Sequence, residues 1–234
     1  MSAAEQIGLG AVQWRLANRQ RAQLYGWFAT LYAQEVSEVA LEGYFGEAYL
    51  PLYAGLADLG LEREVTRLRK SIDALRATPL ARLELAADFA QLFLLDAKTG
   101  ALPYASAYEG EATGSVLYGA AEERMRAFLA ESGLAIQAEF REPADHLAVY
   151  LALMAKLAEQ DAEQGVDSTE FAAAALGQLS FLRGGVLGWL AAFVQRCQEL
   201  EPQFDFYPAL ASLLLGFVRE DELFLDDAAV TPER

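Results

Sequence analysis

Two carboxylates and an imidazole lie within one short segment, Glu142-Pro143-Ala144-Asp145-His146. Proline lacks an N–H group and suits the first position of a helix, so Pro143 predicts a helix start here. Asp145 would then face the unpaired N–H groups and the positive end of the helix dipole, which also disfavours a protonated His146. The segment is therefore either a helix start with a partly buried histidine or a polar grip on a peptide or a cofactor.

Catalysis by a histidine or a metal has little support in the residue types present. His146 is the only histidine and Cys197 the only cysteine, too few for a zinc site of the usual ligands. A Ser-His-Asp triad would need another acid to orient His146, because Asp145 points to a different side of any helix that holds both. A metal site of carboxylates alone stays open. The chain has neither a G-x-x-x-x-G-K-[ST] phosphate loop nor a G-x-G-x-x-G motif, so we expect no nucleotide-driven enzyme and no cofactor.

The chain is strongly acidic, with 34 aspartates and glutamates against 18 lysines and arginines and a net charge of −16. Nucleic-acid binding needs a basic face for the phosphates, so we expect a cationic or neutral partner and no nucleic acid. The stretch 61–77 differs from the rest of the chain because it is rich in basic residues. They form either a solvated face or a contact for an acidic client surface: Arg63, Arg67, Arg69, Lys70 and Arg76.

The cysteine count and the hydropathy pattern predict a cytoplasmic protein. A single cysteine cannot form an intramolecular disulfide, and residues 1–23 lack the apolar segment of a secretory signal. The longest uncharged runs are 171–182, 184–195 and 206–218, all shorter than the roughly 20 residues of a membrane-spanning helix. We interpret them as buried core helices and expect no stable membrane insertion.

Composition and periodicity predict an all-α fold. Alanine and leucine are abundant and β-branched residues are scarce, a balance that favours helix. We expect one domain over residues 1–234 with about eight to ten helices, its N- and C-terminal halves joined by a hinge near 134–142, and an acidic flexible tail over 220–234. Predicted helices cover 12–34, 38–58, 61–77, a segment from Thr78-Pro79 to about Asp96, 115–132, and stretches starting at Pro143, at Asp167 or Ser168, and at Phe206.

Residues 96–115 lack a clear period. An irregular segment of this length inside a compact domain is more often functional than inert. Gly184, Gly185 and Gly188 lie inside a predicted helix and indicate a kink near Gly184.

The Glu142–His146 segment resembles the E-P-x-D-H motif of the TorD/DmsD family of redox-enzyme maturation chaperones. The resemblance extends over roughly residues 25–225, in the order expected for the family. Upstream, Asp88–Phe93 and Pro103–Tyr108 are similar to the family's aromatic-x-x-Leu-Phe helix end and its P-x-x-S-x-Y loop. Downstream, the family's two closing helices are matched by Phe181-Leu182-Arg183 with Trp189 and Phe193, and then by Phe206–Ala211.

Two departures stand beside this resemblance. Gly184-Gly185 replaces a common Glu-His pair and Gly188 a common proline, which bears on the straightness of that helix. The loop at Asp96–Ala101 lacks the expected glycine-rich G-P-x pattern, so loop length and client choice can differ from those of other members.

The resemblance implies a cytoplasmic chaperone that is not an enzyme. Such a protein binds the twin-arginine signal peptide and the apo form of a molybdenum-containing reductase, and holds it for cofactor insertion before export. A leader of this type is cationic and then apolar, which fits carboxylates beside a hydrophobic groove on an acidic protein. The resemblance also implies a monomer or a homodimer formed by domain swapping at 134–142.

The candidate peptide-binding residues follow from the matching motifs. Glu142, Asp145 and His146 are the expected polar end of the site. A second group of candidates consists of Tyr104, Ser106, Tyr108, Phe89 and Phe93. Phe89 and Phe93 are the weaker members of this group, because aromatic residues at helical spacing usually belong to the core.

Three alternatives remain open. A nitrate-reductase-type assembly chaperone would act on the apoenzyme itself. A small helical nucleotide-binding enzyme would use Asp145 or Glu142 with Mg²⁺, although the chain lacks a phosphate loop. A carrier of hydrophobic small molecules would fit the apolar fraction of 54%.

Overall fold

The computed structural model describes residues 10–109, 119–163 and 168–230. Within these ranges the chain forms ten α-helices and no strand, which confirms the all-α prediction. The helices are α1 (Ala11–Ala33), α2 (Glu38–Phe45), α3 (Leu50–Leu56), α4 (Glu62–Arg76), α5 (Ala81–Phe89), α6 (Ala120–Glu131), α7 (Leu147–Glu163), α8 (Ser168–Phe181), α9 (Gly188–Glu199) and α10 (Phe206–Ala229).

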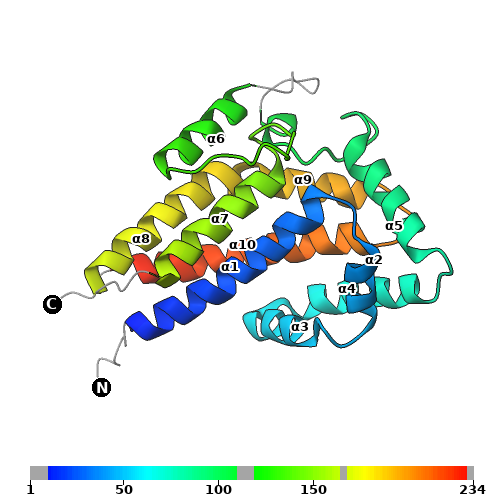
Figure 1. Cartoon of the computed structure of the whole chain (residues 1–234), viewed down its shortest axis with the longest axis horizontal. Helices are drawn as coiled ribbons and strands as arrows, with labels where there is room; N and C mark the ends of the chain where they lie inside the picture. Colours follow the sequence, from blue (N-terminus) through cyan, green and yellow to red (C-terminus); the bar gives the residue numbers. More distant parts are fainter. Residues whose placement is uncertain (1–9, 110–118, 164–167, 231–234) are drawn as a thin grey trace.

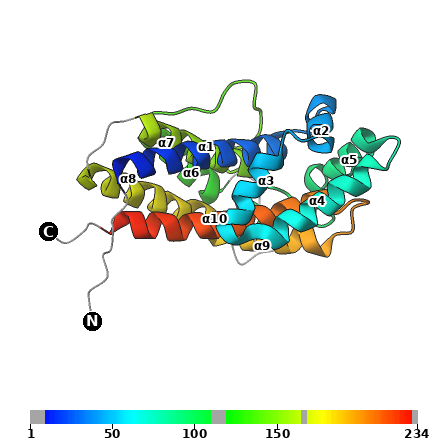
Figure 2. The same ribbon diagram turned by 90° about the horizontal axis from the view of Figure 1, so that it is seen from below.

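Four long helices, α1, α7, α8 and α10, run side by side along the molecule (Figures 1 and 2). The most extensive packing is between α1 and α7, while α10 packs against α8, α4 and α9. Helices α2 to α5 lie together at the opposite end from the start of α1 (Figure 1). The C-terminal helices α9 and α10 thus reach both the long bundle and the α2–α5 end.

An aromatic cluster fills the core beneath α5 and α9. Phe93 lies against Tyr207 with ring centroids 5.2 Å apart and against Phe193 at 6.1 Å. Tyr32 of α1 reaches both Phe93 and Phe193 at 5.7 Å. Burial of large rings in such a cluster is a major source of stability and ties α1, α9 and α10 together.

A buried ion pair links α1 to α10. The Arg21 guanidinium donates to both carboxylate oxygens of Asp221, from Nε and, over 2.8 Å, from Nη2. Tyr25 Oη donates to the same carboxylate over 2.7 Å, and Asn18 accepts from Arg21 Nη1. The hydrogen bonds compensate for taking both charges out of water.

The glycine-rich stretch between α8 and α9 forms a π-helical turn, Leu182–Leu187. The sequence predicted a kink near Gly184, and the structure has a π-helical turn at this place. A Cβ on Gly185 would lie 3.2 Å from the Tyr150 ring and 3.1 Å from the Phe181 ring, so glycine allows α7 to approach closely. The Trp189 indole donates to the Gly185 carbonyl over 2.7 Å and stabilises the turn.

Several predicted helix boundaries are wrong. The predicted helix 38–58 is divided, because the chain turns after Phe45 and starts again at Leu50. Thr78 does not cap the next helix; its hydroxyl donates to the carbonyl of Ala74 at the end of α4, and α5 begins at Ala81. The helix predicted from 115 is described only from Ala120.

The prediction of a flexible tail over 220–234 is also wrong for most of the residues that the structure describes there. Helix α10 continues to Ala229, and Asp221, Leu225 and Ala228 are buried. The ion pair with Arg21 and apolar contacts hold this part of the helix, and both depend on residues far away in sequence. Residues 231–234 lie outside the described ranges.

By length and composition, one described stretch, Phe171–Glu199, could cross a membrane. Half of its apolar window is buried inside the protein, where Leu182, Leu190 and Phe193 contribute to the core.

Candidate functional site

The loop before α6 and the segment before α7 are joined by a short antiparallel pairing. The Ala105 N–H donates to the Asp145 carbonyl over 3.0 Å, and the Leu147 N–H donates to the Pro103 carbonyl over 2.7 Å. Tyr104 and His146 are thereby placed opposite each other. We call residues 103–106 together with 142–147 the clasp, because they fasten the irregular loop to the start of α7.

Asp145 is the buried acid of the clasp. Its side chain is fully shielded from solvent, and Oδ2 accepts the Ser106 N–H over 3.0 Å. The other oxygen, Oδ1, has no hydrogen-bond partner among the described residues. A buried carboxylate that accepts a backbone N–H fixes the loop strongly, since hydrogen bonds to charged groups are stronger than neutral ones.

The interpretation of Asp145 as a helix-start carboxylate is therefore wrong. Helix α7 begins at Leu147, and residues 143–146 form a turn in which the His146 N–H donates to the Pro143 carbonyl. Pairing with residues 103–105 competes with helix formation at this point. Proline at 143 marks the turn instead of the first helical residue.

His146 is held between two aromatic rings in edge-to-face contact. Its ring centroid lies 5.0 Å from that of Tyr104 and 5.4 Å from that of Phe140. Burial lowers the pKa of His146 from its usual value of 6.5 to about 4. Its Nδ1 accepts the Ala148 N–H over 3.1 Å, which assigns the proton of the neutral ring to Nε2.

This arrangement does not fit a Ser-His-Asp triad. In a triad, the nitrogen Nδ1 carries the proton that is donated to the carboxylate. Here Nδ1 accepts a backbone N–H, and Asp145 accepts from Ser106. The clasp residues hold a loop in place and are not arranged to activate a nucleophile.

Glu142 and Tyr104 form the exposed part of the clasp. Tyr104 Oη donates to Glu142 Oε2 over 2.6 Å. Glu142 is exposed and Tyr104 half-buried, so a bound ligand can reach both. The structure thus brings five predicted residues together and separates them into a buried layer, Asp145, His146 and Ser106, and a surface layer, Glu142 and Tyr104.

Tyr108 lies next to the clasp at the end of the loop's short helical turn. Its ring stacks on Trp189 with centroids 6.0 Å apart and contacts Phe193 edge-on. Burial raises the pKa of Tyr108 well above its usual value. Tyr108 therefore connects the loop to α9 and keeps a half-buried edge near the surface.

Phe89 and Phe93 belong to the core. They are 5% and 2% exposed, and both contact Tyr207. Side chains buried to this extent cannot touch a ligand in this conformation. Their placement supports the core interpretation, which the sequence had left open beside ligand binding.

Two residues that sequence reasoning missed also anchor the loop. Arg196 of α9 donates from Nε to the Gly100 carbonyl over 3.1 Å and from Nη2 to the Lys98 carbonyl over 2.7 Å. Phe140 contacts the His146 ring in an edge-to-face arrangement. Arg196 has no sequence signal, because it acts through contacts distant in the chain. Phe140 is close to His146 in the chain but belongs to none of the matched motifs.

The beginning of the loop also needs a small residue at position 100. Asp96 accepts the Lys98 and Thr99 N–H groups, and these hydrogen bonds hold the pKa of its carboxyl below the usual value. A Cβ on Gly100 would lie 2.8 Å from the Leu92 carbonyl oxygen, so only glycine fits without a shift of the backbone.

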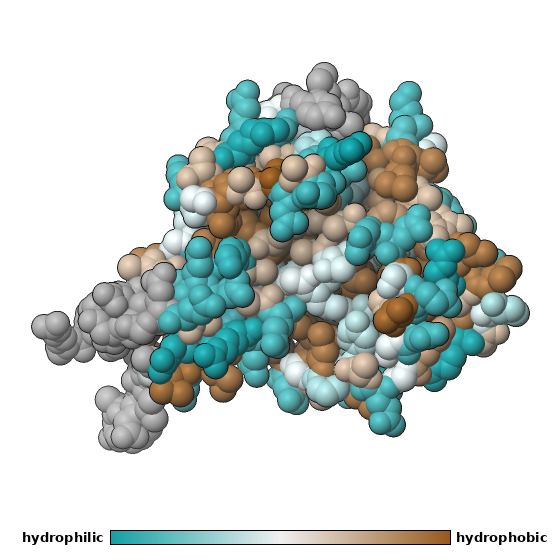
Figure 3. All heavy atoms as spheres, viewed as in Figure 1, coloured by the Kyte–Doolittle hydropathy of each residue, from teal (hydrophilic) through white to brown (hydrophobic). Residues whose placement is uncertain are grey.

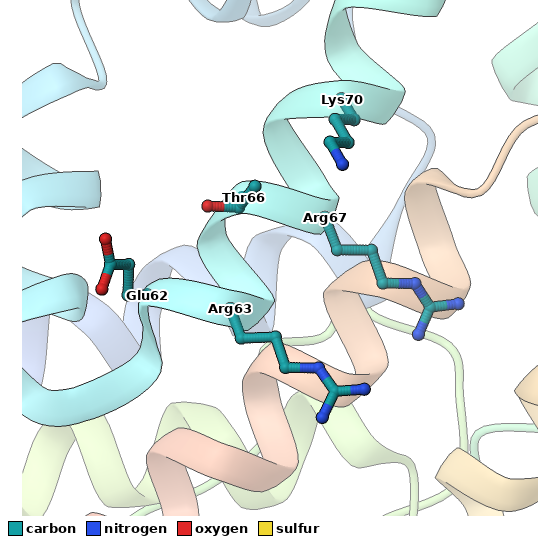
Figure 4. A pocket seen from close by; sticks show the side chains of 5 residues that line it. All are labelled: Glu62, Arg63, Thr66, Arg67 and Lys70. Atoms are coloured by element: carbon teal, nitrogen blue, oxygen red, sulfur yellow. The ribbon is translucent and has the colours of Figure 1, made fainter.

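Three basic residues of α4, Arg63, Arg67 and Lys70, line an open groove of about 510 Å³ together with Glu62 and Thr66 (Figure 4). Arg63 and Arg67 point to the same side of the helix in this view. Arg67 is engaged within the protein, since its Nε and Nη2 donate to the Asp205 carboxylate over 2.7 and 2.6 Å. The basic face of α4 therefore helps to fasten this helix to the start of α10. On the side of the molecule drawn in Figure 3, polar and apolar side chains are mixed over the surface.

The described residues contain no group of three or more His, Cys, Asp or Glu side chains that could hold a metal ion. Cys197 is buried in the core, and burial raises the pKa of its thiol. Within these ranges neither metal nor thiol chemistry is indicated at the clasp.

Comparisons with known proteins identify the family of this chain. The family model described as nitrate reductase delta subunit matches residues 56–195. A chaperone protein TorD from Psychrobacter sp. (strain PRwf-1) is 40% identical, over 93% of this chain and 96% of its own. Those from Photobacterium profundum and Vibrio cholerae are 39% and 36% identical, over 89% and 91% of this chain and 95% of each relative. These relatives are named as chaperones and not as enzymes, and the chain belongs to the TorD family of chaperones.

Proposed function

We propose that the protein is a cytoplasmic chaperone for a molybdenum-containing reductase. It binds the twin-arginine signal peptide and the apo form of that enzyme, and holds them until the cofactor is inserted and the enzyme is exported. The family supports maturation of a redox enzyme in general. We further propose that the signal peptide is bound directly, that the client enzyme contains molybdenum and that the chaperone acts in the cytoplasm.

The observation that carries the proposal is the exposed carboxylate of Glu142 above the buried, hydrogen-bonded layer of the clasp. Glu142 is held by the Tyr104 hydroxyl, and the backbone beneath it is fixed by the Asp145 and Ser106 hydrogen bond. A fixed carboxylate loses less conformational freedom on binding than a mobile one. This geometry suits recognition of a cationic peptide.

The two layers of the clasp have different roles in this account. Glu142, Tyr104 and the edge of Tyr108 contact the leader. Asp145 and His146 are only 0% and 4% exposed, so they position the contact residues and do not touch the peptide. The net charge of −16 adds long-range attraction for a cationic leader.

A co-purification experiment tests the proposal. The full chain is mixed with apo precursor of a candidate reductase and, separately, with the same precursor lacking its leader. The proposal expects tight binding to the precursor and much weaker binding to the leader-deleted form. Equal binding to both would overturn the leader as the principal contact.

The family match favours a second candidate. The description nitrate reductase delta subunit supports an assembly chaperone that acts on the apoenzyme and not primarily on an exported leader. Undiminished binding to leader-deleted client, with no binding to an isolated leader, is the result expected for this candidate.

The oligomeric state remains part of the proposal. The connection 134–142 between α6 and α7 has no helix and is largely exposed, as a hinge for an exchanged arm would be. Light scattering at increasing protein concentration distinguishes a monomer from a swapped homodimer.

A further inference from the structure

A second candidate site lies away from the clasp, where α1 ends and α2 begins. A cleft of about 210 Å³ is lined there by Trp27 of α1, Tyr44 of α2, Glu35 of the connection between these helices and Tyr49 of the turn before α3, among others. None of these residues belongs to the clasp or to a matched motif. Pockets for whole small molecules are usually about 300–1,000 Å³, so the size fits one side chain of a larger ligand.

Three aromatic side chains, Trp27, Tyr44 and Tyr49, line the cleft. Tyr44 and Tyr49 are stacked with centroids 4.1 Å apart, and the Trp27 indole N–H donates to Tyr44 Oη over 2.7 Å. Glycine at position 43 makes room for this stack, because a Cβ there would lie 3.1 Å from the Tyr49 ring. These contacts fix the rings in place before any ligand arrives.

Two other residues that line the cleft carry hydrogen-bond acceptors, and one of them is negatively charged. Glu35 lines the cleft and is exposed, and no lysine or arginine forms an ion pair with it among the described residues. Gln34 adds an amide oxygen. The cleft also adjoins the C-terminal end of α1, whose last turn contains no basic residue to offset its negative dipole end.

We infer that this cleft binds the cationic side chain of an arginine in a peptide held by the chaperone. Aromatic faces attract cations, and a planar guanidinium can stack on a ring while donating two hydrogen bonds to a carboxylate. A lysine ammonium fits the charge but not the flat shape, so arginine binds better than lysine. The identity of the peptide as a leader rests on the proposed function, whereas the guanidinium preference rests on the cleft alone.

The first arm of the test uses a probe that does not depend on any leader. The full chain is labelled with ¹⁵N, and the Trp27 indole N–H signal is identified by its loss in Trp27→Phe. Titration with acetyl-arginine methylamide is expected to shift this signal. The neutral isostere acetyl-citrulline methylamide is expected not to shift it, and equal shifts with both probes would overturn the inference.

The second arm measures leader binding to matched variants. Glu35→Gln removes the charge inside the cleft, and Glu42→Gln removes an exposed charge on the neighbouring helix outside it. We expect Glu35→Gln to weaken binding about fivefold, as an exposed charge pair allows, and Glu42→Gln to have a smaller effect. The loss should vanish for a leader whose arginines are replaced by glutamine, and a loss that persists there contradicts the inference.

A third variant blocks the cleft without changing charge. Ala40 lines it, and Ala40→Phe places a ring inside it. We expect this variant to keep the fold, judged by circular dichroism, and to lose the arginine-dependent Trp27 shift. If the shift remains in a folded Ala40→Phe protein, the probe binds elsewhere.

The outcomes separate this inference from the proposed function. A shift with the arginine probe but no binding of any leader leaves the cleft as a guanidinium site and removes the leader from the account. Leader binding without a Trp27 shift, and with equal effects of Glu35→Gln and Glu42→Gln, overturns the cleft while the leader proposal stands.

Discussion

The Ser106 N–H donates to the Asp145 carboxylate over 3.0 Å, joining two residues 39 positions apart in the sequence. This bond explains why an irregular loop and the start of α7 lie together. Tyr104 and Glu142 meet at the surface because their neighbours are paired beneath them. The peptide-binding surface that we propose is thus a product of the buried hydrogen bonds below it.

Replacement of Asp145 tests this support. Asp145→Asn keeps the shape and loses the charge on a buried hydrogen bond, so we expect a loss of about 1 kcal/mol in the free energy of unfolding. Asp145→Ala leaves the Ser106 N–H unpaired, and the loss should rise to about 2–3 kcal/mol. Urea unfolding measures both, with the exposed Glu139→Gln as the control. Unchanged stability of Asp145→Ala would contradict the role given to the clasp.

Removal of the surface pair should affect binding more than stability. Glu142→Gln keeps the size of the side chain and removes its charge, and we expect a loss of about fivefold in affinity for a twin-arginine leader. Tyr104→Phe removes the hydroxyl that orients Glu142, so its effect should be smaller and should disappear in the Glu142→Gln background. Calorimetry on the four proteins gives the coupling. Additive effects would show that Tyr104 does not act through Glu142.

His146 predicts a pH dependence of stability. Its pKa in the folded protein is about 4, below the usual value of 6.5. Between about pH 4 and pH 6.5, His146 is therefore protonated in the unfolded chain and neutral in the folded protein. The free energy of unfolding should consequently fall as pH decreases from about 6.5 towards 4. His146→Asn, which can still accept the Ala148 N–H, should reduce this decrease. Parallel pH profiles of the two proteins would contradict a buried neutral histidine.

The Arg21 and Asp221 pair predicts a strong asymmetry between single and double replacements. Arg21→Met leaves a buried carboxylate unpaired and should destabilise the protein by about 3–5 kcal/mol, whereas Arg21→Met with Asp221→Leu should recover much of that loss. The exposed pair of Arg183 and Glu222 is the control, and Arg183→Gln should change stability by less than about 1 kcal/mol. Equal losses from Arg21→Met and Arg183→Gln would show that the α1–α10 pair is not buried in solution.

Periodicity was sufficient for much of the fold but not for its boundaries. Residues such as Val65, Leu68, Ile72 and Leu75 repeat at helical spacing, and they form the buried face of α4 as predicted. The end of α10 could not be predicted in this way. The charged residues after Arg219 resemble a solvated tail. Asp221 is nevertheless buried, because it forms an ion pair with Arg21, which lies 200 positions earlier in the chain.

The candidate site was recognised by its motif, whereas its geometry was not. Residue types in Glu142–His146 indicated a polar site, but the dipeptide Glu142-Pro143 gave a wrong helix start. Pairing of Asp145 and Leu147 with the loop decides where α7 begins, and no local pattern reports such pairing. For the same reason Arg196, which holds the loop from α9, had no signal in the sequence.

Calorimetric titration of the full chain with an isolated twin-arginine leader tests the central claim most directly. The leader is taken from a molybdoenzyme encoded near the gene of this protein, and the control is the same peptide with its apolar segment scrambled. The account predicts micromolar or tighter binding of the authentic leader, a dissociation constant equivalent to about −8 kcal/mol, and little binding of the control. Absence of binding to the authentic leader, or equal binding of both peptides, would contradict it.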